Sequence, residues 1–370
     1  MRIFNVSIFS FLSSIILFNL AAIVIILYRK KTDFIVKHGI NLLLLSSLLA
    51  VIRLILPIDL HNAKIINIHH IYQPVKKFLF FKIGNRLFVY QLLLLVWGIG
   101  TLSLLFYYLY SSLLEIYKLN HLNYISSPDI ETLCSNYTNI KIVIKVSSEI
   151  DVPLVWGFFK CHIYFPNYDL SSDEWKFILD HEVLHIKLHD TFIKIFLLFL
   201  TALFWWNPIM YILRKDIDQM LELRCDGILT HDYSIEMQNK YLETILSILS
   251  ILKHQTHPPN SKGHLTASFV NRSAYSLTRQ RFEIILSTNR LTKAKALLCY
   301  SISFLLFFSS YFIILQPATK TTTEQGPTLI LHTSENNYEL YIDGTFYKNL
   351  TQKEAYSKEY SKYEIIEGSN

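Results

Sequence analysis

The chain has 370 residues, of which 51% are hydrophobic and 17% are charged, with a formal net charge of +6. This apolar fraction exceeds what the core of a soluble protein of this length needs, and it is typical of an integral membrane protein. The sequence contains no glycine-rich phosphate loop and no basic patch interleaved with aromatic residues, so we expect no direct contact with nucleic acid.

Four apolar stretches are long enough to cross a bilayer as helices. They comprise residues 3–28, 40–57, 88–114 and 296–315. A cleaved signal peptide would have a shorter apolar region and small residues at its cleavage site, so we expect the first stretch to remain as a membrane anchor. The sequence therefore predicts an α-helical membrane protein with about four spans.

Basic residues at the ends of two stretches indicate which side of the membrane faces the cytoplasm. They are Arg29, Lys30 and Lys31 after the first stretch, and Arg290, Lys293 and Lys295 before the fourth. The prediction is three membrane helices and an outer loop in residues 1–115, a cytoplasmic domain in 116–294, a fourth membrane helix in 295–316 and a short extracytoplasmic tail in 317–370. Further basic residues in the outer loop weaken this argument without reversing it.

Arg53 lies late in the second apolar stretch. It has two interpretations: a charge with a partner inside the membrane, or a side chain that extends to the outer headgroups. We favour the second interpretation, because long basic side chains near the end of a span commonly reach the interface.

The motif HEVLH carries the chemistry of the cytoplasmic domain. His181 and His185 are four residues apart, so on a helix they share one face and can bind one zinc ion. Glu182 can accept a proton from water that zinc activates for attack on a peptide carbonyl. Ser171 and Glu174 have capping-box spacing, which predicts that the helix begins there.

The sequence before this helix predicts a small sheet, and hence an α+β domain. Residues 140–146 and 162–165 have the alternation and branched residues of strands, and Pro153 and Gly157 mark a turn between them. An edge of such a sheet can hold a peptide substrate as an added strand. A purely structural sheet is the alternative, and the sequence does not separate the two.

The apolar run after the motif is broken at Asn207 and Pro208. A single crossing would put the later residues on the opposite side of the membrane from the two histidines, and the run before the break is short for a span. We therefore predict an embedded hairpin near residues 191–213. Trp205 and Trp206 would lie at the membrane interface or, equally well, pack in the core.

The helix after the hairpin contains Glu222 and Asp226, which are one helical turn apart. Glu222 can be a third zinc ligand while Asp226 orients a histidine. Two imidazoles and one carboxylate would leave a position for water. Taken alone, such a charged stretch is more often a solvated helix face.

Four segments together resemble one family: PLVWGFFKCHIYFP, HEVLHIKLHD, FWWNP and ELRCD. They resemble the BlaR/MecR-type integral membrane zinc metallopeptidases, gluzincins with an HExxH…ExxCD pattern that switch on inducible β-lactam resistance. The HtpX and prenyl-protein membrane peptidases are similar more distantly. The resemblance implies zinc ligands at His181, His185 and Glu222, a general base at Glu182, and supporting carboxylates at Asp226 and Asp190.

The resemblance also implies a function. It indicates a multi-pass zinc metalloendopeptidase of the bacterial inner (cytoplasmic) membrane, with its protease domain in the cytoplasm. The expected partners are the lipid bilayer and a protein substrate, either a cytoplasmic transcriptional repressor or the chain itself, and a homodimer is one candidate assembly. The polar stretch 254–281 is then an exposed loop for self-cleavage or a plain linker.

Two alternatives stay open: a general quality-control protease for membrane proteins, and a non-catalytic membrane receptor with a structural zinc. The chain also departs from the family pattern. Family transducers carry a large outer penicillin-binding domain with a Ser-x-x-Lys motif, whereas residues 317–370 contain no such motif. We expect at most one hairpin there, around residues 341–346 with its turn at Asp343 and Gly344.

Overall fold

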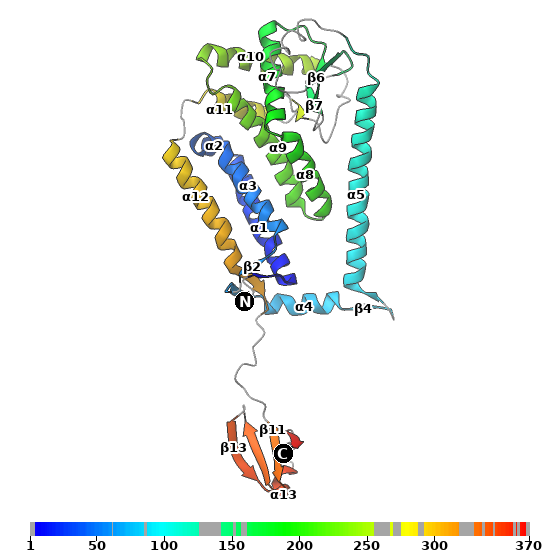
Figure 1. Ribbon diagram of the computed structural model, residues 1–370, viewed down its shortest axis with the longest axis vertical. Helices are drawn as coiled ribbons and strands as arrows, with labels where there is room; N and C mark the ends of the chain where they lie inside the picture. The colour runs from blue at the N-terminus through cyan, green and yellow to red at the C-terminus, as the bar shows by residue number, and fades with distance from the viewer. Residues whose placement is uncertain are drawn as a thin grey trace. The chain divides into compact units, whose positions relative to one another are not determined.

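Figure 1 presents a computed structural model of the chain. It describes residues 4–60, 62–84, 87–125, 142–150, 153–156, 161–254, 267–268, 275–287, 292–317, 329–334, 337–342, 345–357, 360 and 363–367. The chain forms two compact units. The larger unit comprises Met1–Lys64 and Lys76–Ile314, and the smaller comprises Ile65–Val75 and Leu315–Asn370.

The larger unit contains the apolar helices that the sequence predicts. Among the described residues, three helices are long and apolar enough to cross a membrane, or four if one bent pair counts as a span. The three are α1 (Ile8–Arg29), α5 (Val89–Asn120) and α12 (Lys293–Ser309), and the bent pair is α2 (Thr32–His38) with α3 (Ile40–Ile55). The chain turns by 95° between α2 and α3 at Gly39, whose φ of 81° suits glycine.

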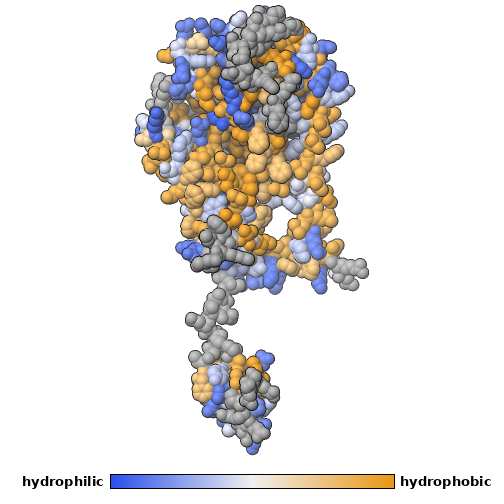
Figure 2. All heavy atoms as spheres, viewed as in Figure 1, coloured by the Kyte–Doolittle hydropathy of each residue, from blue (hydrophilic) through white to orange (hydrophobic). Residues whose placement is uncertain are grey.

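The surface of these helices is suited to lipid. Only 6% of the most apolar window of α5 is buried, and the same holds for α12. Figure 2 shows apolar residues gathered over the visible face of the middle of the larger unit. Exposed apolar area of this extent marks a surface that a membrane or a partner covers.

The structure corrects the expectation for Arg53. Its side chain is buried and forms an ion pair with Asp59, with 2.9 Å between Nη2 and Oδ1. It also donates a hydrogen bond to Ser14 Oγ at 2.6 Å, and its guanidinium lies 4.5 Å from the ring centre of Tyr311. A buried charge needs such partners, so the side chain stays between the helices and does not extend to the headgroups. The preference for a headgroup contact is therefore wrong. The sequence did not reveal the partner, because Asp59 lies beyond the predicted span.

The rest of the larger unit combines helices with a four-stranded sheet of order β6-β8-β7-β9. The strands are β6 (Ile142–Ser147), β7 (Leu154–Trp156), β8 (Cys161–Pro166) and β9 (Ala267–Ser268). Strand β8 runs parallel to β6 and antiparallel to β7, which is antiparallel to β9. Strands β6 and β8 were predicted, whereas β7 occupies the place of the expected turn because three residues are too few to reveal alternation.

Four helices lie between β8 and β9, and a fifth follows β9. They are α7 (Ser172–Lys187), α8 (Asp190–Leu203), α9 (Pro208–Leu229), α10 (Ile235–His254) and α11 (Tyr275–Ile285). The predicted capping box starts α7: Ser171 Oγ accepts from the Glu174 amide, and Glu174 accepts from the Ser171 amide. The apolar face of α7, including Ile178 and Val183, packs in a core with Phe165 of β8 and with α10. This packing holds the motif helix against the sheet.

Helices α8 and α9 form a helical pair with the break where the sequence predicts it. Asn207 caps α9 by accepting a hydrogen bond from the amide of Ile209 at 3.1 Å. The two tryptophans at the turn differ. Trp205 donates to the carbonyl of Trp97 on α5 at 3.3 Å, while Trp206 is 46% exposed.

The smaller unit has its own core and is more than the single hairpin expected from the sequence. Its sheet has the order β13-β12-β11-β14, with β14 parallel to β11. The elements are β11 (Leu329–Ser334), β12 (Asn337–Ile342), β13 (Thr345–Leu350), α13 (Gln352–Ala355) and β14 (Glu364–Glu367). The β12–β13 hairpin is as predicted, with Ile342 opposite Thr345, and its turn residues 343–344 lie outside the described residues. Ile330, Leu340 and Leu350 form the core.

Short elements complete the described chain. They are β1 (Phe4–Asn5), β2 (Asp59–Leu60), β3 (Lys64–Asn67), α4 (His69–Leu79), β4 (Lys82–Ile83), β5 (Leu87–Phe88), the 3-10 turn η1 (Ser310–Phe312) and β10 (Ile313–Gln316). Strand β1 pairs with β2, so the residues just before α1 are hydrogen-bonded to the residues that follow α3.

The contact between α5 and the α8–α9 turn gives a stability prediction. A Cβ at Gly100 would lie 2.6–2.8 Å from three atoms of the Trp205 ring, whereas a Cβ at Gly98 meets nothing within 4 Å. We expect Gly100→Ala to lower the free energy of unfolding by about 1–3 kcal/mol, because the rigid ring must move. Gly98→Ala should leave it unchanged or raise it by up to about 1 kcal/mol. Thermal unfolding in detergent measures both, and equal melting temperatures would contradict the packing described.

Candidate metal centre

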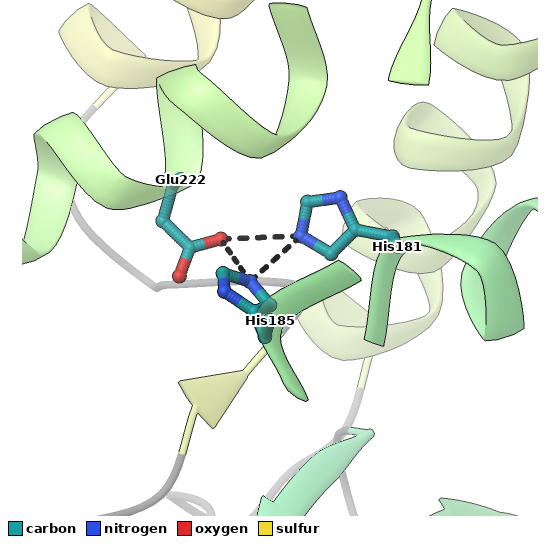
Figure 3. Close-up of side chains that lie close together, drawn as sticks. All are labelled: His181, His185 and Glu222. Atoms are coloured by element: carbon teal, nitrogen blue, oxygen red, sulfur yellow. Dashed lines mark hydrogen bonds and ion pairs between the residues drawn. The ribbon is translucent and has the colours of Figure 1, made fainter. Parts of the chain in front are cut away.

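Helices α7 and α9 bring together the three ligands predicted from the sequence. Figure 3 shows the side chains of His181, His185 and Glu222 pointing toward one another, with the two histidines on one helix and the glutamate on another. The two Nε2 atoms are 3.1 Å apart, and Glu222 Oε2 lies 3.4 Å from Nε2 of His181 and 3.6 Å from Nε2 of His185. All three side chains are buried.

These distances fit a zinc ion. Tetrahedral coordination with bonds of about 2.0–2.1 Å places ligand atoms roughly 3.3–3.4 Å from one another. The three observed separations, 3.1, 3.4 and 3.6 Å, lie around that value. Two imidazole nitrogens and one carboxylate oxygen also form the donor set of catalytic zinc sites, which keep one further position open.

The other nitrogen of each histidine has a partner that fixes the ring. His185 Nδ1 lies 2.6 Å from Asp190 Oδ2 and donates to it. The Tyr241 hydroxyl donates to Asp226 Oδ1 at 2.7 Å, so its oxygen is left to accept from His181 Nδ1 at 3.1 Å. Both rings therefore carry the proton on Nδ1 and offer the Nε2 lone pair to a metal. Asp190 and Asp226 lie where the sequence predicts, but Asp226 acts mainly through Tyr241.

The turn after α7 explains how Asp190 reaches the centre. His189 adopts a left-handed conformation, with φ of 57°, and ends the helix. The chain then reverses, so Asp190 begins α8 facing His185. His189 itself is exposed to solvent just after the end of α7.

Two arginines that were not predicted from the sequence balance the charges of the supporting carboxylates. Arg224 binds Asp190, and Arg281 binds Asp226 through Nε at 2.6 Å and Nη2 at 2.8 Å. Arg281 belongs to the stretch expected to be an exposed loop or linker. That expectation is wrong for its last part, which forms α11 and buries this side chain. Neither arginine has a spacing that marks it as part of a metal site.

The electrostatics of the three ligands are interdependent. Burial lowers the pKa of His181. Burial also opposes charge on His185, but Glu222 and Asp190 together raise its pKa well above the usual value. Burial would likewise raise the pKa of Glu222, yet His185 and His181 hold it well below the usual range. The centre thus favours an ionised Glu222 facing a positive charge, which a bound cation can supply in exchange for the proton on His185.

Glu182, the predicted proton acceptor, is next to a zinc-ligand candidate in the sequence. It follows His181 directly on α7 and is fully buried. Residues 16–283, which include most of α1, the motif helix and most of α11, match the family described as BlaR1 peptidase M56. The chain belongs to the BlaR1 peptidase M56 family. The BlaR/MecR-type resemblance is therefore confirmed, and the match covers the metal centre and the apolar helices that precede it.

Individual M56 relatives carry names of resistance regulators. The chain is 28% identical over 216 residues to the regulatory protein BlaR1 of Bacillus licheniformis, covering 56% of this chain and 35% of that protein. It is 27% identical over 290 residues to the methicillin resistance mecR1 protein of Staphylococcus aureus, covering 72% of this chain and 43% of that protein. The alignments thus span less than half the length of these relatives.

A second group near the M56 centre also has metal-binding atoms: His185, Asp190 and Cys225. Its chemistry suits a metal less well. His185 Nδ1 and Asp190 Oδ2 already share a 2.6 Å hydrogen bond, which a metal would have to break. Burial raises the pKa of the Cys225 thiol to about 11, which disfavours the thiolate that binds zinc. We therefore assign the metal to the group that contains Glu222.

The assignment predicts different losses for two glutamates. Glu222→Ala should weaken zinc binding by more than the ~10–100-fold typical of losing a supporting residue, because a ligand is removed. Glu182→Gln should retain zinc, because only the proton acceptor is lost. Zinc per purified protein, measured by elemental mass spectrometry, tests both, with the exposed Glu236→Ala as control. A full complement of zinc in Glu222→Ala would exclude Glu222 from the centre.

Proposed function

We propose that this chain is a zinc-dependent metalloendopeptidase of a bacterial cytoplasmic membrane that cuts a protein substrate in signal-dependent proteolysis. One observation carries the proposal: His181, His185 and Glu222 converge at zinc-binding distances in a member of a peptidase family, with buried Glu182 next to His181 in the sequence. A structural zinc site has four protein ligands and needs no buried glutamate beside it. The presence of Glu182 therefore argues against a receptor with a purely structural zinc.

The residues divide the reaction among themselves. His181, His185 and Glu222 would hold the zinc, which when bound polarises a peptide carbonyl and lowers the pKa of water. Glu182 accepts a proton from the attacking water and then delivers it to the nitrogen of the leaving amine. Asp190 holds the His185 ring in place through its hydrogen bond. Burial of these groups strengthens each electrostatic contact during the reaction.

The proposed topology rests on the apolar helices and their basic ends. We assign α1, α2 with α3, α5 and α12 to the membrane, with the centre on the cytoplasmic side, as the basic flanks of the first and fourth helices favour. The α8–α9 pair would be embedded from that side without crossing. Residues 317–370 would then lie outside the cytoplasm. They include the small sheet β13-β12-β11-β14, which has its own core.

The sheet suggests how a substrate binds. Strand β9 lies at one edge of the sheet, pairs with β7 and contacts the motif helix α7. Extended backbone therefore lies at the edge of the sheet next to the helix that carries two ligands. We propose that substrates bind there as an added strand. Because β9 belongs to the stretch 254–281, this supports self-cleavage within that stretch beside cleavage of a cytoplasmic transcriptional repressor.

The experiment compares cells that produce the wild type with cells that produce Glu182→Gln. New protein N-termini should be few in the wild type, include a cut within residues 255–274 or in one cytoplasmic regulator, and disappear in Glu182→Gln. Quantitative mass spectrometry of N-terminal peptides measures this, and Glu236→Gln, an exposed glutamate, serves as the control.

Two other outcomes would change the assignment. Cuts spread over many misfolded membrane proteins would favour a general quality-control protease. An identical set of N-termini in the wild type and Glu182→Gln would contradict proteolysis by this chain.

A further inference from the structure

We infer that Arg281 on α11 is a positioning residue for the metal centre, because it holds Asp226 and thereby fixes the tautomer and orientation of His181 through Tyr241. This inference rests on the proposed function, since it concerns how that metal is held. It makes metal affinity depend on the position of α11, a helix that lies outside the HEVLH motif and precedes α12.

The contact between Arg281 and Asp226 is a two-point one. Nε donates to Oδ2 at 2.6 Å and Nη2 donates to Oδ1 at 2.8 Å, with both side chains almost fully buried. Such a fork fixes the plane of a carboxylate as well as its distance. Burial alone would lower the pKa of Arg281, but the adjacent Asp226 raises it above the usual value, so the pair is ionic.

Hydrogen-bond donation runs from the metal centre to Asp226, which also accepts from Arg281. His181 Nδ1 donates to the Tyr241 oxygen, and the Tyr241 hydroxyl donates to Asp226 Oδ1. The Asp226 carboxylate accepts from the Tyr241 hydroxyl and from two nitrogens of Arg281. Without Arg281 it loses two of these three donors and is free to turn. The Tyr241 hydroxyl can then donate to His181 Nδ1 instead. That reversal moves the ring proton of His181 to Nε2, which can no longer bind a metal.

Helix α11 is itself held by the membrane helices. Gln280, the residue before Arg281, accepts a hydrogen bond from Arg29 Nη1 and donates to the carbonyl of Arg29 at 3.3 Å. Arg29 is the last residue of α1, and it also donates to Gln219 of α9 at 2.7 Å. The end of α1, α9 and α11 are thus joined by one buried polar cluster next to the arginine. A shift of α1 would reach Asp226 through this cluster.

The test measures zinc affinity of the full chain in detergent by competition with a chromophoric chelator. Arg281→Gln should weaken zinc binding about 10–100-fold. Arg281→Lys should lose less, because an ammonium restores the charge but not the fork. Arg279→Gln should change nothing, since Arg279 lies on the same helix, is exposed and pairs with Glu283 on the helix surface.

A double-mutant cycle separates positioning from general destabilisation. Tyr241→Phe removes the hydroxyl and keeps the ring, so it should weaken zinc binding to a similar degree. If both residues act through His181, Arg281→Gln combined with Tyr241→Phe should lose no more affinity than the weaker-binding single variant. Additive losses would overturn the inference. Should Arg281→Gln not fold, the comparison of Arg281→Lys with Tyr241→Phe carries the same test.

The failure of this inference differs from the failure of the proposed function. A wild type that binds no zinc at the centre would contradict the proposed function and the inference together. A wild type that binds zinc, with Arg281→Gln folded and equal in affinity, would contradict only the role of Arg281.

Discussion

The metal centre depends on the burial of carboxylates around His181 and His185, three of which form described ion pairs: Asp190, Glu222 and Asp226. An isolated buried charge is costly, so each carboxylate needs a partner of opposite sign. Arg224 serves Asp190 and Arg281 serves Asp226. Glu222 instead faces the two histidines, with a pKa held low by His185. Of these three, Glu222 has no arginine contact among the described ion pairs, with Lys194 Nζ 3.9 Å from its Oε1, and it is the one assigned to the metal. The two arginine-bound carboxylates orient the imidazoles.

The first apolar helix fixes the helix that carries Glu222. Asn207, at the start of α9, donates to Asn19 Oδ1 of α1 at 2.7 Å. About midway along α9, Gln219 accepts from Arg29, the last residue of α1. Two polar contacts therefore set the register of α9 along α1, and apolar packing between the two helices fills the space around these contacts. The centre is built on the membrane helices and not merely attached to them.

Local patterns in the sequence predict much of this arrangement. Histidine spacing on one helix, the capping box at Ser171 and Glu174, and the break at Asn207 are each contained in a few consecutive residues, and the structure has each of them. Arg281 and Tyr241 were not predicted because they lie 55 and 15 residues from Asp226, in segments with no pattern of their own. The same reason explains the missed partner of Arg53, and the short strand β7 has too few residues to reveal its period.

The most direct measurement is X-ray absorption at the zinc edge of the zinc-loaded full chain. We expect the zinc to have only nitrogen and oxygen neighbours, at about 2.0–2.1 Å, with the scattering pattern of two imidazoles. Cys225 Sγ lies 3.4 Å from His185 Nδ1, so a metal displaced to the neighbouring group would acquire a sulfur ligand. A sulfur neighbour at about 2.3 Å would contradict the assignment of His181, His185 and Glu222 as the ligands.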